Sequence, residues 1–210
     1  MILIRRWSIA LLFTIVYLVF QAPAMAHQPF FEDNDIKADN IWLIEDPTIS
    51  TAVYATLETP SDVDYYSFNG SKDQAILLSI TIPQISGQEN FRPTMALLGS
   101  DFPSIDLPKH IIQQTNTGVL ILPPANATPF FEPFSRTSYW TLQEQYISLP
   151  HNGSYLVAVW DEKGQVGRYV FVIGDKEVLG GDPAFPQKMK GYWTRFVPQD
   201  NEQLSGYNAR

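Results

Sequence analysis

The chain has 210 residues, a formal net charge of −8 and no cysteine. The surplus of acidic side chains argues against nucleic acid or an anionic membrane surface as the main partner, and it is compatible with hard cations. Without cysteine there is no disulfide framework, so packing, alone or together with a metal ion, must stabilise the fold.

Residues 1–26 have the pattern of an export signal. Arg5 and Arg6 precede the apolar run WSIALLFTIVYLVF, and Ala24 and Ala26 supply the small residues of an A-x-A cleavage site. We therefore expect an extracytoplasmic protein, periplasmic or secreted, that begins at His27 and has no membrane span after cleavage. The alternatives are cleavage after Ala24 and a signal retained as an anchor, although the run is short for a span, which needs about 20 residues.

Short strand patterns fill the part of the chain that follows the signal. The segment DQAILLSITI alternates with a period of two, which is typical of a strand. Six further segments have the composition of strands: STAVYATL, DVDYYSFNG, TMALLGS, GVLIL, SYLVAVWD and RYVFVIG. Turn residues such as Asn-Gly and Lys-Gly separate many of them. The sequence predicts an all-β fold, an antiparallel β-sandwich or jelly roll, in one domain over residues 27–199.

Two segments interrupt this pattern. Residues 100–137 are rich in proline and mostly irregular, and their aromatic content argues against disorder, so we expect a long loop insert. After the last predicted strand, Asp182 is expected to cap a short C-terminal helix with Pro183 at its first position. Residues 200–210 are interpreted as a polar tail.

The motifs at the two ends of residues 45–175 resemble those of the bacterial pre-peptidase C-terminal (PPC) domain. The start of that domain, a D-x-D-x-Y-x-F strand before an amphipathic strand, matches Asp62, Asp64, Tyr66 and Phe68. The end of the domain, a P-x-x-G-x-Y turn before a hairpin, matches Pro150, Gly153 and Tyr155.

The resemblance implies a non-catalytic β-sandwich with a binding, secretion or stabilising role, in some members with calcium. The chain differs by its longer insert and carries no protease domain, so it is similar to stand-alone secreted bacterial relatives. In such a sandwich Tyr66 and Phe68 would point inward with the apolar face of residues 76–82, and Leu77 outward. The facing layer would come from Tyr155, Val157, Val159, Tyr169, Phe171 and Ile173.

The sequence gives little support for catalysis. There is no G-x-S-x-G, no cysteine nucleophile, and only His27, His110 and His151 are available as histidine bases. We expect a protein that is not an enzyme.

Metal sites are predicted in the acidic segment that precedes the first strand pattern. Calcium is the favoured ion, because it needs about six to eight oxygen ligands. The acidic side chains of this segment are Glu32, Asp33, Asp35, Asp39, Glu45 and Asp46, with Asp62 and Asp64 nearby in the family pattern. The same residues are also typical of a solvated segment, and an aspartate at the start of a strand commonly bonds its own backbone.

Copper is the second metal that we consider. As the first residue after cleavage, His27 offers an amine and a ring nitrogen, and either His110 or His151 would have to complete the site. The alternative is that His27 only marks the junction.

Aromatic residues cluster in TPFFEPFSRTSYW, within the insert and just beyond it. Exposed, they would stack on a glycan or contact an apolar protein partner; buried, they would anchor the loop. The residues are Phe130, Phe131, Phe134, Tyr139 and Trp140. The sequence thus predicts an exported, non-catalytic binding or accessory module of the cell envelope, with a glycan or protein ligand. The alternative is a metal-binding protein of the envelope.

Overall fold

The computed structural model describes residues 27–113, 117–132 and 136–194. The predicted signal, the aromatic Phe134 and the predicted polar tail lie outside the described residues. Within these ranges, no helix has the length and apolar character needed to cross a membrane.

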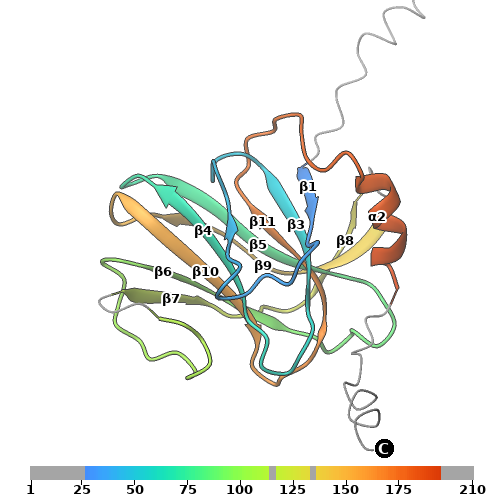
Figure 1. The fold of residues 1–210 in the computed structure, drawn as a ribbon, viewed down its shortest axis with the longest axis horizontal. Coiled ribbons are helices and arrows are strands. Elements are labelled where there is room, and N and C mark those ends of the chain that lie inside the picture. Colours follow the sequence, from blue (N-terminus) through green and yellow to red (C-terminus); the bar gives the residue numbers. More distant parts are fainter. Residues whose placement is uncertain (1–26, 114–116, 133–135, 195–210) are drawn as a thin grey trace, which may run out of the picture.

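Two sheets stack face to face (Figure 1). The six-stranded sheet has the order β1 (Gln28–Phe31), β3 (Thr51–Leu57), β11 (Gly167–Ile173), β5 (Ala75–Pro83), β9 (Thr137–Ser148) and β8 (Thr128–Glu132). The five-stranded sheet has the order β2 (Trp42–Leu43), β4 (Asp64–Gly70), β10 (Gly153–Asp161), β6 (Pro93–Gly99) and β7 (Gly118–Leu122). The predicted all-β sandwich is confirmed, and each of the seven predicted strand segments forms a strand.

The prediction of a purely antiparallel sandwich is wrong for the N-terminal segment, residues 27–46. This segment supplies β1 and β2, which pair in parallel with β3 and β4 respectively, while all other strand pairs are antiparallel. Each is a short strand at the edge of its sheet. Neither has a full alternating pattern, because strands of two to four residues are too short to show one.

The predicted Pro-rich insert is more regular than expected at its C-terminal end. Phe130 and Phe131 lie on β8, an edge strand that pairs with β9. An edge position tolerates Pro129, whose missing N–H would interrupt the ladder of a central strand. Residues 128–132 and 137–141 of the aromatic segment are therefore paired antiparallel strands.

The main core fills the space between the sheets and contains every residue predicted to point inward. Its arrangement differs from the prediction in one respect. The strands β4 and β10 are neighbours in one sheet, and β5 and β11 are neighbours in the other. The two facing layers are therefore Tyr66 and Phe68 with the β10 residues, and the β5 residues with Tyr169, Phe171 and Ile173.

Each sheet also has a covered outer face. The helix α2 (Phe185–Tyr192) packs on the six-stranded sheet, where Phe185, Met189 and Tyr192 join a second apolar cluster. The Pro-rich loop covers the five-stranded sheet through Ile111. The helix begins later than predicted, with Ala184 as its N-cap, and Asp182 Oδ1 instead accepts the backbone N–H of Ala184 at 2.8 Å.

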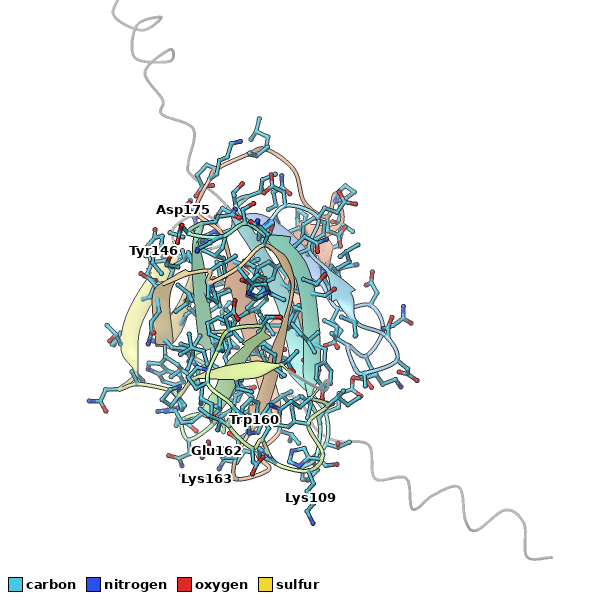
Figure 2. The ribbon with its side chains drawn as sticks, turned by 90° about the vertical axis from the view of Figure 1, so that its left-hand side faces the viewer. Lys109, Tyr146, Trp160, Glu162, Lys163 and Asp175 are labelled. Atoms are coloured by element: carbon cyan, nitrogen blue, oxygen red, sulfur yellow. The ribbon has the colours of Figure 1, made fainter. Side chains whose placement is uncertain are left out.

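The two ends of the sandwich carry different groups (Figure 2). At one end, the exposed Tyr146 donates its O–H to Asp175 Oδ2 at 2.9 Å. Glu162 and Lys163 lie at the opposite end, in the turn after β10. The end marked by Asp175 also holds the turn after β2, because the backbone N–H of Asp175 donates to the carbonyl of Thr48 at 3.2 Å.

Candidate cation site

The turn that follows β1 is organised around the carboxylate of Glu32. Its Oε1 accepts the backbone N–H of Ile36 at 2.7 Å, and its Oε2 accepts the backbone N–H of Thr56 at 2.8 Å. Ile36 is buried in the main core. The side-chain amide of Asn40 donates to the carbonyl of Asp35 at 2.8 Å and fixes the rest of the turn. Glu32 thus ties the N-terminal segment to β3.

Asp64, the first residue of β4, faces the interior. It is fully buried (0% exposed), because it has the same parity along the strand as Tyr66 and Phe68, which point into the core. The O–H of Tyr169 donates to Asp64 Oδ2 at 2.5 Å, and Tyr169 in turn lies 2.7 Å from the hydroxyl of Tyr66. A buried hydrogen-bond chain therefore positions this carboxylate.

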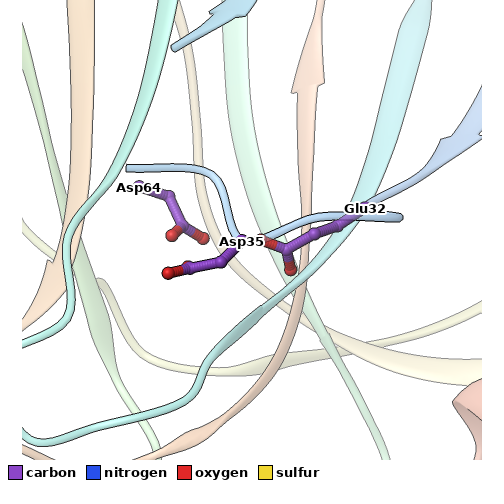
Figure 3. A group of neighbouring side chains, drawn as sticks. All are labelled: Glu32, Asp35 and Asp64. Carbon is purple, nitrogen blue, oxygen red and sulfur yellow. The ribbon is translucent and has the colours of Figure 1, made fainter. Parts of the chain in front are cut away.

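Glu32, Asp35 and Asp64 converge on one point (Figure 3). One carboxylate oxygen from each lies within 4.8 Å of the others. Asp35 Oδ1 and Asp64 Oδ1 are both buried, and neither has a hydrogen-bond partner among the described residues. Buried polar atoms are normally paired, so these two oxygens are expected to bond to a proton, a water molecule or a cation.

The pKa values in this carboxylate group also indicate that its negative charges lack a counter-ion. Burial is the largest cause that raises the pKa of Glu32, to about 7, and the charge of Asp35 adds to it. Burial also raises the pKa of Asp64 well above its usual range, with repulsion from Glu32 second and the hydrogen bond from Tyr169 opposing. Such shifts are expected where like charges are held together away from water. A bound cation would remove both penalties.

The predicted metal ligands are dispersed over the N-terminal segment. Asp35 joins the carboxylate group, while Asp33 forms an ion pair with Lys188 of α2 at 2.6 Å. Asp39 is exposed, and Asp46 is exposed and accepts both the backbone N–H and the hydroxyl of Thr48 on Oδ1. Asp62 accepts the N–H of Glu58 at 2.6 Å, the backbone bonding typical of a turn.

The histidines are placed apart from the carboxylate group. His27 is exposed, and its Nδ1 is hydrogen-bonded to Ser50 Oγ. His151 Nδ1 lies 2.8 Å from the hydroxyl of Tyr155, within the turn before β10. In the part of the chain that the structure describes, the single group of three or more metal-ligating side chains contains no histidine.

The predicted aromatic surface is divided between solvent and protein. Phe130 and Phe131 are 46% and 57% exposed on β8. Trp140 is half-buried and packs against the main core. Tyr139 is buried at 3% exposure and packs on Trp193 with ring centroids 4.9 Å apart, so it does not contribute to an exposed binding surface.

No protein-family model and no curated protein matches this sequence. Among solved structures, the chain is similar to the pre-peptidase C-terminal domain of a Bacillus anthracis collagenase, with 12% identity, 68% of this chain and 99% of that chain covered, and a TM-score of 0.35. The family to which the sequence motifs point is thus among the structural neighbours.

Two other neighbours are a periplasmic protein and a surface-associated protein. PliG of Salmonella Typhimurium, a periplasmic inhibitor of g-type lysozyme, has 16% identity over 64% of this chain and 99% of its own, with a TM-score of 0.34. CorA of Methylomicrobium album BG8, a surface-associated copper-binding protein, has 8% identity over 72% of this chain and 99% of its own, with a TM-score of 0.34. These scores describe a loose similarity of chain path, and the fold follows from the strand topology itself.

Proposed function

We propose that this chain is an exported, non-catalytic binding or accessory module of the cell envelope, and that a divalent cation holds its N-terminal segment on the β-sandwich. The observation that supports the cation is the pair of unpartnered, buried oxygens, Asp35 Oδ1 and Asp64 Oδ1, beside Glu32. A patch of exposed acidic side chains alone would not support a bound cation, because exposed carboxylates need no counter-ion.

Calcium is the ion that fits these donors best. The group offers carboxylate oxygens and neither imidazole nor thiolate, which favours hard cations over zinc or copper. Calcium accepts an irregular shell of about six to eight oxygens, whereas magnesium demands a near-ideal octahedron. Glu32, Asp35 and Asp64 would supply the protein ligands, and water or backbone carbonyls the remainder.

A cation at this point would stabilise more than the three side chains. The Glu32 turn carries Ile36 into the main core, and the segment beyond it forms β2. Asp33, next to Glu32, also pairs with Lys188 of α2. The cation site thus lies where the N-terminal segment meets both sheets, and an ion there would oppose the unfolding of that segment.

Thermal unfolding with and without calcium tests the proposal. A ligand that binds only the folded state raises its stability by about 2.7 kcal/mol at a concentration of about 100 times its Kd. We expect calcium to raise the melting temperature of chelator-treated protein. Magnesium at the same concentration is the control for ionic strength. An identical melting curve in chelator and in calcium would exclude the site.

The exposed pair Phe130 and Phe131 supports a second surface, which would bind the glycan or protein partner of the module. Aromatic rings on an edge strand combine stacking faces with an open backbone edge. Phe131→Ala should retain the wild-type melting temperature and lose retention on envelope glycans or an envelope protein extract. A variant that melts early and binds normally would show that these rings are structural anchors.

A further inference from the structure

A groove of about 640 Å³ lies on the side of the sandwich formed by the N-terminal segment. Its walls come from β1 and β2, the outermost strands of the two sheets on that side. The buried residues in its lining include Ile44, which is 4% exposed, and Thr51, which is 7% exposed. The groove thus lies between the edge strands of the two sheets, while the outer edge of β1 itself is covered where the backbone N–H of Asp182 donates to the carbonyl of Pro29 at 2.7 Å.

Aromatic and apolar side chains form the inner lining. Phe30 of β1 and Trp42 of β2 meet edge to face, with ring centroids 6.1 Å apart and an interplanar angle of 61°. Ile41 is 42% exposed and Leu43 is 62% exposed beside them. Exposed apolar side chains gathered in a concave site are typical of a binding surface.

The rim of this groove is acidic. Its lining contains Asp33, Glu45 and Asp46 and no lysine or arginine among the described residues. Asp33 is already paired with Lys188, whereas Glu45 and Asp46 have no ion pair in the described part of the chain. Hydrogen bonds from Thr48 lower the pKa of Asp46, and the nearby charge of Lys176 lowers it further.

We infer that the β1–β2 groove binds an extended, basic peptide segment of a partner protein, with apolar side chains over Leu43 and an arginine or lysine against the acidic rim. The Trp42 ring adds a cation–π surface for the same positive group. Charge complementarity favours the basic peptide over a neutral glycan, because only the peptide would gain electrostatic attraction from Glu45 and Asp46. This inference rests on the proposal that the chain is a binding module and does not depend on the cation site.

Calorimetric titration with a blocked hexapeptide of alternating leucine and arginine tests the inference. A matched peptide with glutamine in place of arginine and the neutral sugar chitotetraose are the comparison ligands. The double variant Glu45→Gln/Asp46→Asn should weaken binding of the basic peptide by about threefold to tenfold at low salt, with a smaller loss at high salt. Leu43→Ser should weaken it by about tenfold at any salt concentration.

Glu162→Gln is the matched charge control, because Glu162 is exposed at the opposite end of the sandwich (Figure 2). Ile105→Ser is the apolar control, since Ile105 is 40% exposed in the Pro-rich loop. Both controls should bind like wild type, and all variants should keep the calcium-dependent rise in melting temperature if the cation site is correct.

Three results would overturn the inference: no binding of the basic peptide, equal binding by groove variants and controls, or preferential binding of chitotetraose in the groove. If wild type binds the basic peptide but shows no calcium-dependent rise in melting temperature, the cation site is refuted and the groove inference stands.

Discussion

Replacing Asp64 with asparagine should stabilise the cation-free protein. Asparagine keeps an acceptor for the O–H of Tyr169, 2.5 Å from Asp64 Oδ2, and places an amide donor near the unpartnered oxygen of Asp35. It also removes one of three ionisable carboxyl groups whose oxygens lie within 4.8 Å of one another. Two unit charges at that distance repel by about 3 kcal/mol at an effective dielectric constant of about 20. Proton uptake by the wild-type carboxylates cancels part of this repulsion, so the expected gain in unfolding free energy in chelator is about 1–3 kcal/mol.

Calcium should stabilise wild type but not Asp64→Asn, and so offset the advantage of the variant. At about 100 times its Kd it adds about 2.7 kcal/mol to wild type, which is a rise of roughly 5–10 °C for a domain of this size. Asp64→Asn should show no rise. Asp39→Asn is the control, because Asp39 is exposed and outside the carboxylate group, and it should keep the full calcium response. Differential scanning calorimetry measures all three proteins in chelator and in calcium. If Asp64→Asn melts below wild type in chelator and still gains stability from calcium, the reasoning is wrong.

Three further predictions follow from the same structure. Burial raises the pKa of Glu32 from 4.5 to about 7, so between these pH values the folded, calcium-free protein keeps a proton that the unfolded chain has lost. The free energy of unfolding in chelator should therefore fall by up to about 3 kcal/mol as the pH rises from about 4.5 to about 7. An unfolding free energy that rises over this range would contradict the shift. In urea titrations, Phe68→Ala in the core should cost about 3–5 kcal/mol and Phe131→Ala on β8 less than about 1 kcal/mol; equal costs would place Phe131 in the core. N-terminal sequencing of exported protein should begin at His27, and membrane-bound material that retains Met1 would contradict export by cleavage.

The central strands were predictable because their patterns report burial directly. Residues 76–82 alternate, and β10 and β11 have near-continuous apolar runs, so the period and the turns that bound them define each strand. The edge strands β1, β2 and β8 were not predictable in this way. Apart from the buried Phe31 on β1, their side chains are half-buried or exposed, so neither face selects a hydrophobic pattern.

The candidate cation site was predictable in part. The acidic N-terminal segment pointed to a hard cation, but composition alone does not indicate which carboxylates meet. Asp64 carried the informative signal, because its parity with Tyr66 and Phe68 predicts an inward-facing carboxylate, whereas Asp62 is bonded in a turn. The position of Glu32 depends on parallel pairing of β1 with β3, a long-range contact that no local pattern encodes.

Calcium titration by isothermal calorimetry at about pH 7.5 tests the central claim most directly. Wild-type protein freed of metal by a chelator should bind one calcium ion per chain, with an affinity that falls as the pH is lowered, because protons compete for Glu32 and Asp64. Asp64→Asn should show no saturable binding, and Asp39→Asn should bind like wild type. The absence of binding by wild type, or equal binding by Asp64→Asn, would contradict a cation held by Glu32, Asp35 and Asp64.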